Sequence, residues 1–121
     1  MSIKSYISGL GFNVPDTIMS NKDLSKFMDT SDEWIYERSG IKERRVVEHH
    51  ETDGIGPCDL AIPAVQDALK MANLKKEDID FILFSTAMPD HFLPGSGCFL
   101  QEKMDFPLIG ALDIRAQCAG F

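Results

Sequence analysis

The chain has 121 residues, of which 44% are hydrophobic and 26% are charged, and its formal net charge is −7. This composition is typical of a soluble globular domain. The negative charge argues against nucleic acid as the main partner, because phosphate binding requires a surplus of lysine and arginine. No apolar run approaches the ~18 residues of a membrane span, and residues 1–11 lack the pattern of a secretory signal. We therefore expect a cytoplasmic protein with no membrane or nucleic-acid partner.

The first half of the chain predicts short elements joined by turns. Residues 4–10 are typical of a short strand that runs into a glycine- and proline-containing turn. Ser20 or Asn21 can cap a short helix. Ser31 is the expected N-cap of a second short helix, which ends at Gly40 because glycine permits a left-handed exit.

The second half alternates between helical and strand patterns. Residues 56–72 carry apolar side chains at helical spacing, and Pro63 within them predicts a kink or a helix start near that proline. Residues 81–86 form a nearly continuous apolar run, typical of a strand buried on both faces, and residues 108–114 predict a second buried strand. With a helix expected over residues 95–104, this order predicts an α/β fold with parallel strands.

Metal binding and disulfide bonding are not expected from the cysteines and histidines. The three cysteines, Cys58, Cys98 and Cys118, form no CxxC pair, so a zinc site or a disulfide framework is improbable. Residues 49–51 (HHE) superficially suggest a metal site, but adjacent histidines seldom face one ion and no third ligand is evident. We interpret this stretch as a loop.

Cys118 differs from the other cysteines because it follows an apolar strand and stands among small residues. If a helix follows, Cys118 lies at its N-terminus, where the dipole and the unpaired N–H groups favour the thiolate. The backbone N–H of Cys118 could then donate to an oxyanion. The alternative is a buried structural cysteine, the commonest state of a lone cysteine, and for Cys58 and Cys98 we retain that interpretation.

Two motifs resemble those of the 3-oxoacyl-(acyl-carrier-protein) synthase III family. Residues 118–121 (CAGF), after an apolar strand, resemble the nucleophile segment of that family. Residues 30–35 (TSDEWI), followed by residues 37–45 (ERSGIKERR), resemble its other N-terminal signature. The resemblance extends over nearly the whole chain and covers about the first third of a family member. It implies an α/β, thiolase-like fold, of which residues 1–121 are the N-terminal part of the first α/β half.

The resemblance also implies a reaction, the decarboxylative Claisen condensation that initiates fatty acid synthesis. Cys118 would take an acyl group from an acyl-CoA, commonly acetyl-CoA, and pass it to malonyl-acyl carrier protein, with no cofactor besides the CoA substrate. Trp34 and Arg38, at i and i+4 on one helix face, would hold the CoA adenine, and Thr30 is a further candidate contact. Family members are usually homodimers, and Leu93 falls where one subunit helps to bound its partner's acyl pocket.

The chain departs from the family beside the nucleophile, where Arg115 replaces a small or amide residue and Gln117 replaces a small one. These bulkier groups leave the acyl preference open. Decarboxylation in this family depends on a histidine and an asparagine far downstream, so we expect these 121 residues alone to be inactive and poorly folded. Two other interpretations remain. One is an enzyme of the same fold, such as 3-hydroxy-3-methylglutaryl-CoA synthase or a simple acyltransferase, and the other is a non-enzymatic fragment or interaction module.

Overall fold

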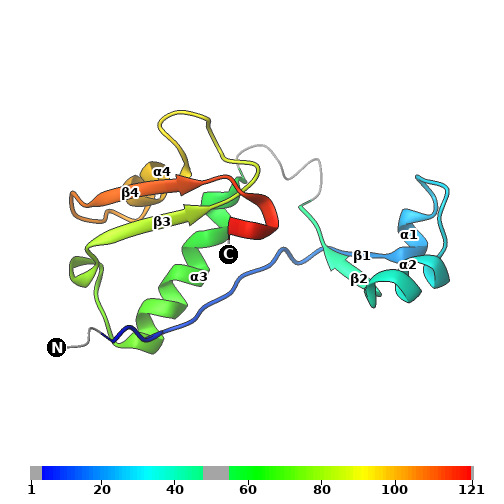
Figure 1. Cartoon of the computed structure of the whole chain (residues 1–121), viewed down its shortest axis with the longest axis horizontal. Coiled ribbons are helices and arrows are strands. Elements are labelled where there is room, and N and C mark those ends of the chain that lie inside the picture. Colours follow the sequence, from blue (N-terminus) through cyan, green and yellow to red (C-terminus); the bar gives the residue numbers. More distant parts are fainter. Residues whose placement is uncertain (1–3, 48–54, 121) are drawn as a thin grey trace. The chain divides into compact units, whose positions relative to one another are not determined.

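The computed structural model describes residues 4–47 and 55–120. The chain divides into two compact units, one within residues 14–54 and the other within residues 1–13 and 55–121. No helix in the described ranges is long and apolar enough to cross a membrane. The elements, shown in Figure 1, are in chain order β1 (Ile18–Ser20), α1 (Asn21–Leu24), α2 (Asp32–Ser39), β2 (Glu43–Arg45), α3 (Pro57–Ala72), η2 (Lys76–Asp78), β3 (Phe81–Ser85), α4 (Ser96–Lys103), β4 (Gly110–Ile114) and η3 (Gln117–Gly120).

The smaller unit contains an antiparallel pair of strands, β1 and β2, together with α1 and α2. Ser20 caps α1, because its hydroxyl accepts the backbone N–H of Asp23 at 3.1 Å. The Asp23 carboxylate accepts the backbone N–H of Ser20 at 3.1 Å in return, which completes a capping box. This reciprocal bonding confirms the predicted helix start and selects Ser20 over Asn21 as the cap.

The sequence also predicted both ends of α2. The Ser31 hydroxyl accepts the backbone N–H of Trp34 at 3.1 Å, and Gly40 ends the helix in the left-handed region with a φ of 71°. The helix places Trp34 and Arg38 one turn apart on the same face.

A fully buried asparagine, Asn21, joins three elements of the smaller unit. Its side-chain N–H groups donate to Asp32 of α2 at 2.8 Å and to the carbonyl of Ile41 at 2.7 Å. Its side-chain oxygen accepts from Arg44 of β2 at 3.1 Å. A buried amide is tolerated when it is paired in this way, so Asn21 fixes α1 against α2 and β2.

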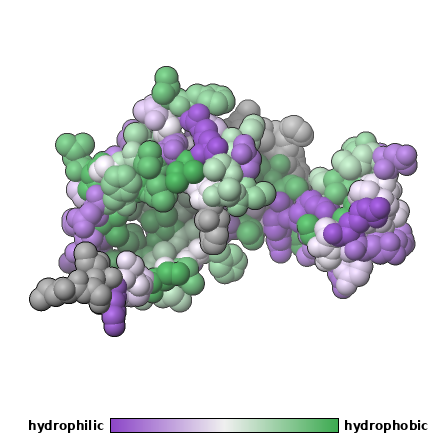
Figure 2. Space-filling model, viewed as in Figure 1, coloured by the Kyte–Doolittle hydropathy of each residue, from purple (hydrophilic) through white to green (hydrophobic). Residues whose placement is uncertain are grey.

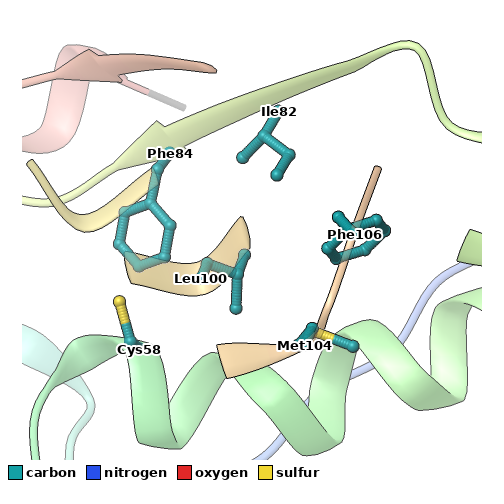
Figure 3. Packing of buried hydrophobic residues seen from close by; sticks show 6 residues of the cluster. All are labelled: Cys58, Ile82, Phe84, Leu100, Met104 and Phe106. Atoms are coloured by element: carbon teal, nitrogen blue, oxygen red, sulfur yellow. The ribbon is translucent and has the colours of Figure 1, made fainter. Parts of the chain in front are cut away.

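The larger unit is an α/β arrangement around the parallel pair β3 and β4, which confirms the predicted strand direction. Figure 3 shows Ile82 and Phe84 of β3 pointing toward α3 and α4, where Cys58 and Leu100 complete the packing. Helix α3 begins at Pro57 and continues through Pro63, so the alternative of a helix start near Pro63 is wrong. A proline is well tolerated at a helix start.

The expectation that residues 81–86 are buried on both faces is wrong for the described chain. Ile82 and Phe84 are buried, whereas the alternating Phe81 and Leu83 are 55% and 59% exposed. On β4, Leu112 is 52% exposed as well. Figure 2 shows many such apolar residues at the surface of the larger unit. Within the described residues, helices cover one face of this sheet and leave the other bare.

Residues 4–10 form no strand, contrary to the sequence-based expectation. They run along α3 instead, with the backbone N–H of Leu10 3.2 Å from the sulfur of Met71. Gly11 lies so close to this helix that a Cβ atom there would collide with the carbonyl of Ala64. A strand needs a neighbour for its ladder of hydrogen bonds, and none of the strands in the described ranges pairs with this segment.

Candidate functional site

The carboxyl ends of β3 and β4 bring two loops to the same edge of the larger unit. The strands run parallel, with Ser85 opposite Ile114 at their last paired position. The backbone N–H of Thr86 donates to the carbonyl of Ile114 at 3.0 Å, which holds the two loops together where they leave the sheet. This edge is where open α/β sheets generally bind their ligands. Leu93 lies on the first of these loops and Cys118 lies on the second.

Cys118 lies on a sharp turn, η3, and is exposed. Gln117, immediately before it, has a φ of 45°, which non-glycine residues seldom adopt. Gly120, two residues after Cys118, packs so closely on Ser85 that a Cβ atom there would collide with the serine hydroxyl. The turn is therefore fixed against the end of β3, and it presents the thiol at the carboxyl edge of the sheet.

The predicted helix after Cys118 is not resolved by the described residues. They end in a four-residue 3₁₀ turn, Gln117–Gly120, and residue 121 lies outside them. Stabilisation of the thiolate by a helix dipole therefore stays a prediction. The exposure of Cys118 differs from the buried state expected for a structural cysteine.

The other two cysteines lie inside helices, as predicted. Cys58 is fully buried in α3, and its Sγ lies 3.1 Å from the carbonyl oxygen of Ser96. Desolvation by burial, reinforced by the nearby Asp90, raises the pKa of Cys58 to about 12. Cys98 is half-buried in α4. Cys58 is therefore a protonated packing residue at neutral pH.

A buried polar network, which the sequence did not reveal, fixes the loop between β3 and α4. The hydroxyl of the fully buried Ser96 donates to Asp90 at 2.6 Å, and the Asp90 backbone N–H donates to that hydroxyl at 3.0 Å. The second carboxylate oxygen of Asp90 accepts the backbone N–H of Cys58 at 3.3 Å. Burial alone would raise the pKa of Asp90, but the hydrogen bonds from Cys58 and Ser96 outweigh it and lower that pKa.

Asp113 of β4 caps the start of α4. Its carboxylate accepts the backbone N–H groups of Ser96 at 2.6 Å and Gly97 at 2.8 Å. A carboxylate at a helix N-terminus is favoured by the helix dipole. Gly95, with a φ of 113°, and Gly97 both pack so tightly on Asp113 that Cβ atoms there would lie 2.7 and 2.8 Å from its oxygens. The glycines flanking Ser96 were the sequence signal for this close approach.

Arg115 connects the two loops at the sheet edge. Its Nη2 donates to the carbonyl of Phe92 at 3.0 Å, and its guanidinium carbon lies 4.8 Å from the centre of the Phe92 ring. Phe92 and Leu93 are 75% and 87% exposed, so the loop tip carries two apolar side chains at the surface.

Trp34 and Arg38 lie together on α2 in the smaller unit, as their spacing predicted. The guanidinium carbon of Arg38 is 4.5 Å from the centre of the indole ring, and Trp34 is 53% exposed. This is a cation–π contact. A planar group inserted between the indole and the guanidinium would require Arg38 to swing away.

Thr30 precedes α2 and is half-buried. Its hydroxyl oxygen is buried and has no hydrogen-bond partner among the residues that the structure describes. Such a group normally has a partner, but because this oxygen is buried, a ligand could reach it only if the side chains around it moved. The structure thus groups Trp34 and Arg38 in one unit and places Leu93 and Cys118 on adjoining loops of the other.

The stretch 49–51, interpreted from the sequence as a loop, lies outside the described residues. Among the residues described, no group of three or more histidine, cysteine, aspartate or glutamate side chains could hold a metal ion.

Comparison with known proteins finds relatives over nearly the whole chain, although no family model matches it. The beta-ketoacyl-[acyl-carrier-protein] synthase III of Geobacillus kaustophilus is 46% identical over 115 residues, which are 95% of this chain and 36% of the relative. The protein of the same name from Campylobacter jejuni is 42% identical over 120 residues, 98% of this chain and 36% of the relative. The chain therefore spans about a third of the length of the curated relatives it matches.

Solved structures agree with the sequence comparison. The crystal structure of 3-oxoacyl-[acyl-carrier-protein] synthase III from Aquifex aeolicus matches with a TM-score of 0.86 and 38% identity, over 95% of this chain and 36% of that one. The synthase III structure from Thermus thermophilus matches with a TM-score of 0.77 and 36% identity, over 91% and 33% of the two chains. By sequence and by fold, the chain is a homologue of about one third of a beta-ketoacyl-[acyl-carrier-protein] synthase III and has the α/β fold of these thiolase-like condensing enzymes.

Proposed function

We propose that this chain belongs to an acyltransferase that initiates fatty acid synthesis by condensing an acyl-CoA with malonyl-acyl carrier protein. The observation that carries this proposal is an exposed cysteine on a sharp turn at the carboxyl edge of a parallel sheet. The names of the relatives support it, because they specify a beta-ketoacyl synthase acting with an acyl carrier protein. They favour this reaction over that of 3-hydroxy-3-methylglutaryl-CoA synthase.

The proposed chemistry has two stages, and Cys118 takes part in both. In the first, its thiolate attacks the thioester carbonyl of the acyl-CoA, a C–S bond forms to the enzyme as the C–S bond to CoA breaks, and CoA leaves as a thiolate that takes a proton from water. In the second, malonyl-acyl carrier protein loses CO₂, and the resulting carbanion attacks the acyl-enzyme. A carbon–carbon bond forms and the Cys118 thiolate is released. The backbone N–H of Cys118 is proposed to stabilise the oxyanion.

The proposed CoA site lies on α2 of the smaller unit. Trp34 offers a half-exposed indole for adenine, and Arg38 adds a guanidinium plane beside it. Thr30 is proposed as a further contact, which requires its buried and unpaired hydroxyl to become accessible when the ligand binds. Leu93 is proposed to bound the acyl pocket across a homodimer interface. Because both substrates arrive as thioesters, this reaction requires no cofactor.

The proposal is tested by measuring the condensation reaction with protein expressed from the complete reading frame. Purified protein is incubated with acetyl-CoA and malonyl-acyl carrier protein, and the 3-oxoacyl-carrier protein is measured. Cys118→Ser is expected to abolish product, because a hydroxyl is a far weaker nucleophile than a thiolate. Cys98→Ser, which alters a half-buried cysteine on α4, serves as the matched control and is expected to retain turnover. Full activity of Cys118→Ser, or no condensation by the unmodified protein, would refute the proposed function.

A further inference from the structure

Arg115 is the first residue after β4 and lies three positions before Cys118. A long cationic side chain so close to a proposed nucleophile could in principle bind an anionic substrate directly. Its contacts indicate otherwise, because one nitrogen already donates to the Phe92 carbonyl at 3.0 Å and the guanidinium lies 4.8 Å from the Phe92 ring centre. Arg115 is therefore engaged with the neighbouring loop.

The contact uses both properties that distinguish arginine from lysine. A guanidinium can donate a hydrogen bond in its plane while one face of that plane stacks on an aromatic ring. Arg115 does both to a single residue, Phe92, binding its backbone and its side chain together. A lysine ammonium could replace the hydrogen bond but not the stacked plane.

The rest of this loop is anchored independently of Arg115. Near β3, Thr86 donates its backbone N–H to Ile114 at 3.0 Å. Further along, Asp90 is bound to Ser96 and to the backbone of Cys58. Loss of the arginine contact would therefore free the loop tip, and the loop base would stay in place.

We propose that Arg115 is a specificity-determining positioning residue, which clasps the tip of the loop between β3 and α4. The clasp fixes the apolar side chains of Phe92 and Leu93 at the sheet edge that presents Cys118. Because Leu93 is proposed to bound the acyl pocket of the partner subunit, a fixed apolar tip limits the space into which an acyl chain on the partner's Cys118 can extend, and the enzyme consequently favours short acyl groups. This inference rests on the proposed acyl transfer to Cys118.

The test compares acylation of Cys118 by acetyl-CoA and octanoyl-CoA in the protein from its complete reading frame. Arg115→Ala is expected to raise the octanoyl-to-acetyl ratio of kcat/KM by about tenfold, the effect of losing one charge-assisted hydrogen bond and one cation–π contact. Arg115→Lys is expected to shift the ratio in the same direction, because it cannot stack. Phe92→Ala removes the aromatic partner of the same contact and is also expected to raise the octanoyl-to-acetyl ratio of kcat/KM. Lys70→Ala, which removes a positive charge from the exposed surface of α3, is expected to leave the ratio unchanged.

A second readout reports on the loop itself. Chymotrypsin cleaves after exposed aromatic residues, so a freed loop tip in Arg115→Ala should be cut after Phe92 faster than in the unmodified protein. Circular dichroism establishes that each variant is folded. A folded Arg115→Ala with an unchanged chain-length ratio overturns the clasp, and so does an Arg115→Lys that behaves as the unmodified protein. An unmodified protein that is acylated by neither CoA ester refutes the proposed function instead.

Discussion

The carboxylate of Asp113 accepts the backbone N–H of Ser96 at 2.6 Å, which joins the end of β4 to the start of α4. Asp113 also accepts from Gly97 at 2.8 Å, so a single side chain satisfies two of the N–H groups that a helix start leaves without partners. These two hydrogen bonds fix the position of the N-terminus of α4 relative to the end of β4, the strand that leads to Cys118.

Replacement of Asp113 by alanine is expected to destabilise the protein by about 1–3 kcal/mol, because two buried N–H groups lose their acceptor. Asp113→Asn retains one acceptor oxygen and should therefore lower the free energy of unfolding by less than Asp113→Ala does. The measurement is urea unfolding of the protein from its complete reading frame. Asp80→Asn, at an exposed position before β3, is the control and should change the free energy of unfolding little. Equal effects of the Asp113 and Asp80 substitutions would contradict the capping role.

The three cysteines should differ sharply in their rate of alkylation. At pH 8, iodoacetamide is expected to modify Cys118 rapidly, because its side chain is exposed on η3. Cys58 should resist, since it is buried and its pKa, raised to about 12 chiefly by desolvation, leaves it protonated. Peptide mapping by mass spectrometry gives the order of modification. Modification of Cys58 before Cys118 in the folded protein would contradict the burial of the Cys58 thiol.

The bare face of the sheet predicts how the 121 residues behave when they are expressed by themselves. We expect them to bind the dye ANS, because Phe81 and Leu83 have no cover within the described residues. We also expect no condensing activity, because the histidine and asparagine on which decarboxylation depends in the resembling family lie downstream of these residues. Leu83→Ser should lower dye fluorescence and leave the far-ultraviolet dichroism intact. Phe84→Ser, on the covered face, should remove the folded signal, since core truncation of phenylalanine costs about 3–5 kcal/mol. Cooperative unfolding without dye binding, or measurable turnover, would contradict this expectation.

The ion pair between Asp59 of α3 and Lys103 of α4, at 2.6 Å, predicts a dependence of stability on pH. The hydrogen bond from the Gly56 backbone N–H, followed by that from Lys103, lowers the pKa of Asp59. Because the folded pKa lies below the unfolded one, the stabilisation is present above about pH 4 and is lost as pH falls through the folded value. Asp59→Asn should therefore reduce the loss of stability between neutral and acid pH, by less than about 1 kcal/mol for such a partly exposed pair.

Urea unfolding across that pH range provides the measurement for the ion pair. Asp67→Asn, on the exposed face of the same helix, removes an equal charge and is expected to leave the pH profile unchanged. If the free energy of unfolding depended on pH in the same way in both variants, the contacts of Asp59 with Lys103 and Gly56 would contribute nothing to that pH dependence.

Local signals in the sequence were sufficient to predict the helices and the parallel direction of β3 and β4. Ser20, Ser31 and Gly40 predicted helix limits because a cap acts on the backbone within three or four residues of itself. The alternation of helical and strand patterns predicted the parallel pair β3 and β4 for a similar reason, since a crossover helix separates parallel strands.

Properties that depend on distant partners could not be predicted in the same way. Residues 4–10 have the composition of a strand, but a strand forms only where a neighbour supplies hydrogen bonds. The apolar run of β3 indicates that its side chains favour burial on both faces. Whether another element covers each face depends on the packed structure, in which Leu83 is exposed. The contacts of Asp113 with Ser96 and of Arg115 with Phe92 join residues 17 and 23 positions apart, a separation that no periodicity reports.

The most direct test of the central claim is mass spectrometry of the protein from its complete reading frame after incubation with acetyl-CoA. We predict an acetyl group on the peptide that contains Cys118, and its disappearance when malonyl-acyl carrier protein is added. An acetyl group found only on another residue, or an adduct on Cys118 that malonyl-acyl carrier protein does not discharge, would contradict the assignment of Cys118 as the acyl-carrying nucleophile.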